Sequence, residues 1–286
     1  MQYTPDFLLE KIPIGTWIKF FVEYLTDNFD DQFRFFSDGV EWMIIQTINL
    51  LNSAPPLFLI AGIALISYFL HRSWKMALGI ILGLILILNL GYWEQTVETV
   101  ALVIFATSIS VIFGVPVGIV AAHNRWFFTL IRPVLDLMQT IPTFVYLIPT
   151  LMLFGLGMVP GLISTVIFSI PAPIRLTYLG ITSVPGRLID AGKAFGASRM
   201  QLLMKVELPH ALPTIMAGLT QCIMLSLSMV VIAALVGADG LGKPVIRALN
   251  SVNISQGFEA GLAIVIVAIV LDRMLKQPET VKTGQK

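Results

Sequence analysis

Apolar residues along this chain are gathered into seven long runs, which are separated by short polar segments. Each run approaches the roughly 20 residues that an α-helix needs to cross a hydrocarbon layer about 30 Å thick. None of them alternates between apolar and polar positions as elements of a water-soluble domain do. The pattern therefore predicts an all-α integral membrane protein with about seven transmembrane helices, at residues 54–71, 76–92, 97–121, 134–157, 160–182, 211–236 and 258–275.

The segment before the first run has a different pattern. Residues 1–53 are rich in acidic side chains, and apolar residues recur there at helical spacing, namely Trp17, Phe20, Phe21, Tyr24 and Leu25. We expect an amphipathic helix at the extracytoplasmic membrane interface, with docking of a partner as the alternative. The segment lacks the basic start, compact apolar region and small-residue cleavage site of a signal peptide. The predicted organisation is an extracytoplasmic or interfacial segment (1–53), two accessory helices (54–92), a membrane domain (93–276) and a cytoplasmic tail (277–286).

Composition and charge agree with this class and orient the chain. Hydrophobic residues make up 56% of it and charged residues 12%, which argues against a water-soluble domain. The net charge of +1, without a basic block, gives no sign of nucleic-acid binding. Cytoplasmic loops carry an excess of Lys and Arg, so we expect the N-terminus outside and the C-terminus inside. This places inside Arg72, Lys75, Arg125, Arg132, Arg187, Lys193, Arg199, Lys205, Arg273, Lys276, Lys282 and Lys286.

A charged, glycine-containing stretch lies between two of the predicted spans, DAGKAFGASRMQLLMKVELP at residues 190–209. Its start predicts a short helix in which Leu188, Gly192 and Phe195 share one face. Gly196 is expected to end this helix in the left-handed conformation.

The second half of the stretch predicts another short helix. Ser198 suits its N-cap, and Pro209 is expected to close it, because the residue before a proline is pushed out of helical geometry. Its apolar face consists of Leu202, Leu203 and Val206. Two short helices joined at a glycine suit docking into a partner's groove. A cytoplasmic loop packed on its own helices is the alternative.

The spacing of this stretch resembles the EAA loop of permease subunits in ATP-binding-cassette importers, whose form is E-A-A-x3-G-x9-I-x-L-P. The chain has D-A-G-x3-G-x9-V-x-L-P, with three departures from that form. In the family this loop is the coupling helix seated in the ATPase subunit. The resemblance therefore implies a coupling loop at 183–210, with coupling residues Asp190, Ala191, Gly192, Gly196, Leu208 and Pro209.

Longer stretches resemble the permeases of glycine betaine, proline betaine and choline importers, and the similarity runs over residues 54–275. The stretches are LDLMQTIPTFVYLIPTLMLFGLG (135–157), IPAPIRLTYLGI (170–181) and LPTIMAGLTQCIMLSLSMVVIAALVGADGLG (212–242). A fourth, GFEAGLAIVIVAIVLDR (257–273), leans toward the choline-associated members.

This resemblance implies a fold, a place and partners. The fold is that of a type I ABC importer permease in the cytoplasmic (inner) membrane. ATP and Mg²⁺ are bound by partner ATPase subunits, so no cofactor is expected in this chain. An extracytoplasmic binding protein is expected to select a quaternary ammonium solute. One chain has no second similar half, so we expect a homodimer with the translocation path at its interface.

Several residues in the predicted spans are candidates for contact with such a solute. A methylated cation donates no hydrogen bond from its nitrogen, so aromatic faces and polarizable groups hold it. The same residue types also pack helices together or form interhelical hydrogen bonds. The candidates for the path are Gln139, Thr140, Phe144, Tyr146, Ser226 and Met229, with Met138, Met224 and Ser228 beside them.

Arg175 and Asp136 are two of the charged residues within the predicted spans. Arg175 lies toward the inner end of its span, where it can either extend to the headgroups or make a gating contact. Asp136 lies just inside its span, and we expect it to pair with Arg132, one helical turn earlier.

Other chemistry is not supported by the sequence. GADGLGKP (237–244) follows a phosphate-binding loop as far as the lysine, but Pro244 replaces the Ser or Thr that holds magnesium. Its glycines suit a sharp turn between two spans. His71, His123 and His210 lie near membrane borders without metal-binding spacing.

An ion-gradient-driven secondary transporter is the alternative function. It predicts acidic residues near the middle of the bilayer, and no predicted span has one at its centre. A membrane enzyme lacks a constellation of residues to carry its chemistry.

Overall fold

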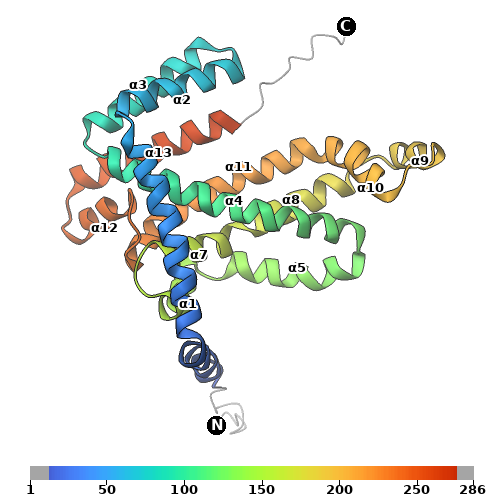
Figure 1. The fold of residues 1–286 in the computed structure, drawn as a ribbon, viewed down its shortest axis with the longest axis horizontal. Helices are drawn as coiled ribbons and strands as arrows, with labels where there is room; N and C mark the ends of the chain where they lie inside the picture. Colours follow the sequence, from blue (N-terminus) through green and yellow to red (C-terminus); the bar gives the residue numbers. More distant parts are fainter. Residues whose placement is uncertain (1–12, 276–286) are drawn as a thin grey trace, which may run out of the picture.

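The structure, a computed structural model, describes residues 13–275, and these residues form helices and turns without a strand. Four long helical stretches, several shorter helices and one long N-terminal helix make up the molecule (Figure 1). In chain order they are α1 (Ile14–Ser53), α2 (Pro56–His71), α3 (Trp74–Asn89), α4 (Trp93–His123), α5 (Arg125–Thr140), η2 (Thr143–Tyr146), α6 (Leu147–Phe154), α7 (Met158–Ser169), α8 (Pro171–Thr182), α9 (Gly186–Ala194), α10 (Arg199–Leu202), η3 (Leu203–Glu207), α11 (Leu208–Ala233), η4 (Ala234–Val236), α12 (Gly242–Asn250) and α13 (Ile254–Leu275).

Helices α4, α7, α8 and α11 pack against one another as the centre of the molecule (Figure 1). Lipid is as apolar as the helices, so association in a membrane depends on close packing and on hydrogen bonds between helices. Gly118 of α4 provides such a close approach, because a Cβ there would lie 2.7 Å from the carbonyl oxygen of Ile174. The buried hydroxyls of Ser110 and Ser169 share a hydrogen bond of 3.0 Å between α4 and α7.

We expect Gly118→Ala to destabilise the contact between α4 and α8 by about 1–3 kcal/mol, because the added methyl group meets backbone and forces the helices apart. Thermal unfolding of the purified protein measures this change. Gly62→Ala on α2 is the matched control, since nothing lies within 4 Å of a Cβ built there. Equal stability of the two variants would contradict the packing argument.

All of the predicted spans fall on apolar helices. Four helical stretches are long and apolar enough to cross a membrane: Trp93–His123, Met158–Thr182, Arg199–Val236 and Ile254–Leu275. Two bent pairs, Gly15–Ser53 with Pro56–His71 and Arg125–Thr140 with Thr143–Phe154, meet the same criterion together, and Trp74–Asn89 is a shorter apolar helix. The membrane class is confirmed, and the number of seven spans stays a prediction.

The span expected at 134–157 is not one straight helix. The chain bends by 105° between α5 and the segment Thr143–Phe154. Ile141 leaves helical geometry (φ −64°, ψ 131°) because it precedes Pro142, which restricts the residue before it to extended conformations. Pro142 therefore divides the expected span into two helical segments.

Helix α1 confirms the helical pattern expected in the N-terminal segment. It is bent at Phe29 and meets α2 at an angle of 96°. Figure 1 shows it running across the direction of α4, α8 and α11. Phe33 packs edge-on against Phe154 of α6, with 5.3 Å between ring centroids, while Trp17 and Phe20 are exposed. Its location at the extracytoplasmic interface stays a prediction.

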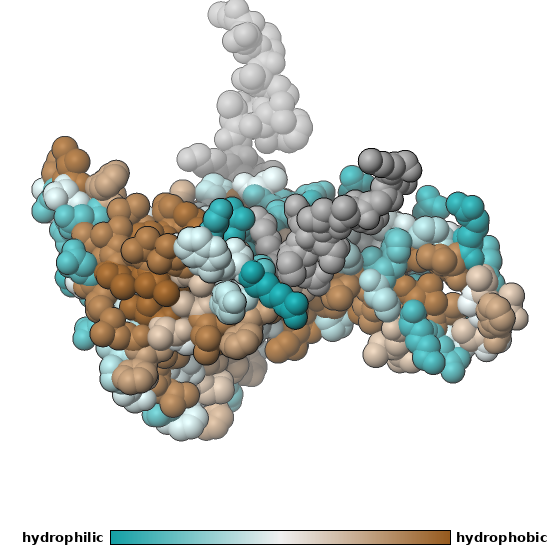
Figure 2. Space-filling view, turned by 90° about the horizontal axis from the view of Figure 1, so that it is seen from above, coloured by the Kyte–Doolittle hydropathy of each residue, from teal (hydrophilic) through white to brown (hydrophobic). Residues whose placement is uncertain are grey.

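The surface of the molecule changes character along its length. Figure 2 shows continuous apolar surface over the left half of the view, and hydrophilic residues gathered around the right-hand end. That end is where α9 lies in Figure 1, at the opposite end of the long helices from α12. The residues around α9 therefore form the polar end of an otherwise apolar bundle.

Candidate coupling loop and translocation path

The first half of the loop at 190–209 folds as its pattern predicts. Gly196 has a left-handed backbone (φ +76°) directly after the C-cap of α9. Its N–H donates to the carbonyl of Lys193 (2.9 Å), and the N–H of Ala197 donates to the carbonyl of Gly192 (3.0 Å). These two bonds are those of a Schellman motif, which satisfies carbonyls at a helix end. The predicted turn at Gly196 is confirmed.

The start of the second helix is also confirmed, but its end is not where Pro209 was expected to place it. The hydroxyl of Ser198 accepts from the N–H of Gln201, and the Gln201 side chain accepts from the Ser198 N–H, which completes a capping box. The helix then continues from α10 through the π-helix η3 into α11. Leu208 donates to the carbonyl of Leu203, five residues back. Pro209 follows this π-helix, in the first turn of α11, and does not end the helix.

The two short helices of the loop pack through Gly192. A Cβ there would lie 2.5 Å from Cδ2 of Leu202, which is buried. The departure from the second alanine of the EAA pattern therefore makes room for Leu202. Phe195 lies at the C-cap of α9 and is 92% exposed, and Leu188 of the same helix is exposed as well.

Several large apolar side chains of this loop are exposed on the surface of the chain. Phe195 is the most exposed of them, and the others are Leu188, Met200 and Met204. Charged Asp190 and Lys193 lie on the same short helix and are exposed as well. An exposed apolar cluster within a polar rim is typical of a surface that another protein covers.

A contact between His123 and Glu207 that the sequence did not indicate joins the loop to α4. Nε2 of His123 lies 2.9 Å from Oε2 of Glu207, whose side chain is only 9% exposed. Nδ1 of His123 lies 2.9 Å from the carbonyl of Ile119, which only accepts, so this nitrogen carries a proton. Nε2 faces the carboxylate, and the contact is an ion pair when the ring is protonated. The only feature of the sequence that pointed to this contact is the acidic residue directly before Leu208 and Pro209. Its partner is far away along the chain, so local spacing does not identify it.

The candidates for the path do not all lie on one surface. Ser226 and Met229 are fully buried within the chain, and the Ser226 hydroxyl donates to the carbonyl of Cys222. The Tyr146 hydroxyl donates to the carbonyl of Met138 (2.7 Å), across the bend between α5 and η2. Phe144 is 58% exposed. The remaining candidates are partly or largely exposed: Gln139, Thr140, Met138, Met224 and Ser228.

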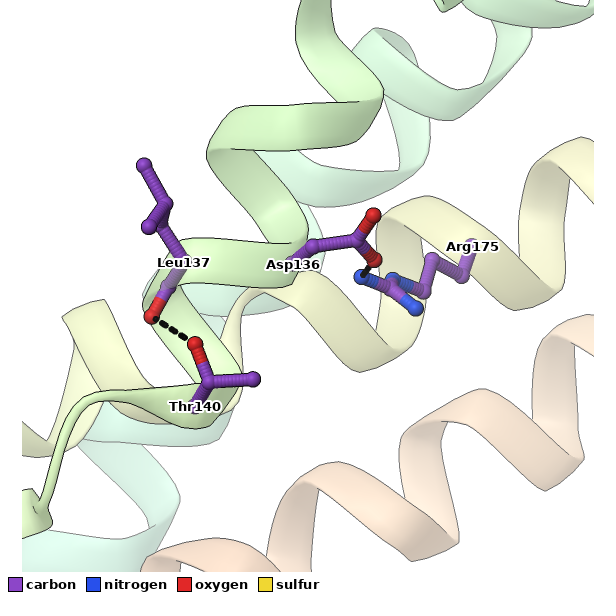
Figure 3. Close-up of polar contacts among 4 residues, drawn as sticks. All are labelled: Asp136, Leu137, Thr140 and Arg175. Carbon is purple, nitrogen blue, oxygen red and sulfur yellow. Dashed lines mark hydrogen bonds and ion pairs between the residues drawn. The ribbon is translucent and has the colours of Figure 1, made fainter.

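Asp136 pairs with Arg175 and not with Arg132. Nη2 of Arg175 donates to Oδ1 of Asp136 over 2.6 Å, which joins α5 to α8 (Figure 3). The side chains are 37% and 53% exposed for the arginine and the aspartate. The expected partner was one turn away on the same helix, where such pairs contribute only about 0.2–0.5 kcal/mol. The packing of α5 on α8 brings a better-placed cation from 39 residues away.

The glycine-rich segment at 237–244 forms a turn between α11 and α12, as expected. Gly237 and Gly240 have positive φ values of +90° and +123°. The N–H of Leu241 donates to Oγ1 of Thr99 on α4 (2.8 Å), which ties the turn to the bundle. Lys243 forms an ion pair with Asp239. Among residues 13–275, no group of three or more His, Cys, Asp or Glu side chains is arranged to hold a metal ion.

An apolar helical bundle, with a loop at one end that exposes apolar and charged side chains, is the arrangement expected of a transport permease. The family model for the binding-protein-dependent transport system inner membrane component matches residues 114–275. The chain belongs to this family. It is therefore a multi-pass inner-membrane protein and the permease subunit of an ABC transporter, which works with ATPase subunits.

Relatives of known name cover nearly the whole chain. The glycine betaine transport system permease protein OpuAB of Bacillus subtilis is 43% identical over 97% of this chain and 98% of its own length. The glycine betaine/carnitine transport permease protein GbuB of Listeria monocytogenes is 41% identical over 93% of this chain and 95% of its own. A solved structure of the MetNI methionine ABC transporter, inward facing, has a TM-score of 0.56 at 23% identity, over 62% of this chain and 91% of its own. That last likeness concerns the fold alone.

Proposed function

We propose that this chain is the permease subunit of an ATP-driven importer that carries a quaternary ammonium solute, choline or a betaine, across the cytoplasmic membrane. The similarity to OpuAB and GbuB carries the proposal, because it extends over almost the full length of each of these chains. Both relatives are named for glycine betaine transport. The coupling loop and the bend after α5 lie within the part shared with the family.

In this proposal, the loop transmits the energy of ATP hydrolysis. The exposed apolar residues around Phe195 enter a groove of the ATPase subunit, and the coupling residues position them. ATP and Mg²⁺ are bound by the partner and not by this chain. ATP-driven closure of two ATPase subunits moves two coupling loops together and shifts the bundle between inward-open and outward-open states. The coupling residues are Asp190, Ala191, Gly192, Gly196, Leu208 and Pro209.

We infer that two copies of the chain form the translocation path between them. The described part of the chain holds one bundle, without a second similar half. The exposure of Gln139, Thr140 and Phe144 favours these three for solute contact. Burial of Ser226 and Met229 assigns them to the walls behind the path, and the hydrogen bond of Tyr146 assigns it to the bend.

The same proposal orients the chain. The end that carries α9 is cytoplasmic, in agreement with its basic residues, and the N-terminus is outside. An extracytoplasmic solute-binding protein then docks at the end that carries α12. This protein supplies the solute when the path is open outward.

Reconstitution tests the function. The permease is placed in proteoliposomes with its ATPase subunit and binding protein, and uptake of labelled glycine betaine, proline betaine, carnitine and choline is compared with and without ATP. We expect uptake of at least one of these solutes, dependent on ATP and on the ATPase subunit. Uptake that persists without the ATPase and collapses with an ionophore would instead establish the secondary transporter.

A further inference from the structure

The ion pair between Asp136 and Arg175 lies where lipid cannot cover it. Asp136 belongs to the last turns of α5, and Arg175 to the continuous stretch Met158–Thr182, which is apolar enough to cross a membrane. Both side chains keep a large part of their surface open in the single chain. Charged groups at membrane depth face protein or water, because exposure to hydrocarbon costs several kcal/mol. This face of α5 and α8 is therefore turned toward a water-filled path or a second copy.

Other polar features gather on the same side of α5. Gln139 and Thr140 follow Asp136 by three and four residues, a spacing that brings side chains onto one helix face. Figure 3 shows Thr140 one turn beyond the pair, with its hydroxyl donating to the carbonyl of Leu137. Directly afterwards the helix breaks and the chain bends by 105°. Irregular backbone at membrane depth is tolerated where it is buried in protein or lines a water-filled cavity.

The contact between α5 and α8 does not depend on the ion pair alone. The rings of Phe128 and Tyr178 stack between the same two helices, with 3.7 Å between centroids and an interplanar angle of 3°. The charges of Asp136 and Arg175 are thus free to exchange partners while the helices remain in contact.

We propose that the Asp136–Arg175 pair is a transient binding site for a zwitterionic solute, with its quaternary ammonium group at Asp136 and its carboxylate at Arg175. The proposal rests on the proposed function, and it names the chemical class that this part of the path favours. A zwitterion replaces each half of the ion pair with a partner of the same charge, so neither side chain is left uncompensated. Guanidinium suits a carboxylate because it donates parallel hydrogen bonds to both oxygens.

The same chemistry discriminates between solutes. A simple cation such as choline compensates Asp136 but leaves Arg175 without an anion. A charge that the bound solute shields from water without compensating it is costly. The pair therefore favours a betaine over choline at this step, in addition to any selection by the binding protein. Without solute the two side chains neutralise each other.

The test uses the full complex of permease, ATPase and binding protein in proteoliposomes, with glycine betaine as the probe. Arg175→Gln and Asp136→Asn are each expected to lower ATP-driven glycine betaine uptake about tenfold or more, the loss that one charged contact predicts. Co-purification with the ATPase should stay unchanged. Arg34→Gln, which breaks the exposed Arg34–Asp30 pair on α1, is the matched control and should retain uptake.

A charge exchange separates solute contact from a structural role. In the double variant Asp136→Arg, Arg175→Asp, a purely structural pair is restored, so uptake and thermal stability recover together. We expect stability to recover while uptake stays lost, because the charges that meet the solute are interchanged. Recovery of uptake, or unchanged uptake in the single variants, would overturn the inference. Failure of the unmodified complex to take up glycine betaine with ATP would instead overturn the proposed function.

Discussion

Replacing Phe195 with Asp is expected to abolish stable assembly with the ATPase subunit while the permease itself stays folded. The side chain is 92% exposed, so its replacement removes little internal packing. In the proposed assembly, this aromatic ring is the largest exposed apolar group that the loop offers to a groove of the ATPase subunit. A buried aromatic anchor contributes about 2–4 kcal/mol to an interface, and a carboxylate in its place adds a desolvation penalty. Affinity should fall by about 30-fold or more.

Co-purification of the ATPase with the permease measures this effect, and ATP-driven uptake should be lost in parallel. Phe35→Asp is the matched control, because Phe35 is 83% exposed on α1, away from the loop. It should retain the ATPase. If Phe195→Asp retains it equally well, the loop does not dock through this residue, and the alternative of an ordinary cytoplasmic loop gains support.

His123→Ala is expected to loosen the coupling segment at its attachment to α4. The change leaves the nearly buried carboxylate of Glu207 without the imidazole ring that faces it. Loss of one partner of a buried pair costs about 3–5 kcal/mol, and the partial exposure of His123 reduces the expected cost to about 1–3 kcal/mol. The ratio of solute transported to ATP hydrolysed should fall, since the motion of the loop is transmitted less firmly to the bundle.

Thermal unfolding of the permease and the transport ratio check this expectation. The double variant His123→Ala, Glu207→Gln removes both charges and should regain most of the stability lost in the single variant. His210→Ala, at an exposed position in the first turn of α11, is the control and should change neither quantity. A double variant less stable than His123→Ala would show that Glu207 is held by other groups.

Much of the coupling loop could be predicted because its determinants are local. Gly196 takes a left-handed conformation that other residues adopt at a cost, and Ser198 with Gln201 forms a capping box within four residues. The end at Pro209 was mispredicted. The helix continues through Pro209 after the π-helix η3, and helices of this chain also continue through Pro116, Pro133 and Pro213.

The candidate path was less predictable. Ser226 and Phe144 were both candidates for contact with the solute, yet Ser226 is fully buried and Phe144 is largely exposed. Burial depends on which neighbouring helix covers each face of a span. An apolar helix has no polar face, so its sequence does not show which side packs against protein and which side faces lipid. The partner of Asp136 was misassigned because local spacing favours Arg132, while the packing of α5 on α8 brings Arg175 into contact.

The sequence by itself determined the membrane class, the positions of the apolar segments and the turn and cap of the loop, because hydropathy, caps and glycine conformations act within a few residues. The tertiary structure decided the bend after α5, the attachment of Glu207 to His123 and the pairing of Asp136 with Arg175. These features join residues up to 84 positions apart, from 123 to 207. Only the packing of the helices fixes such distances, because pairing energies between charges depend on separation in space and on burial, and neither is encoded by position along the chain.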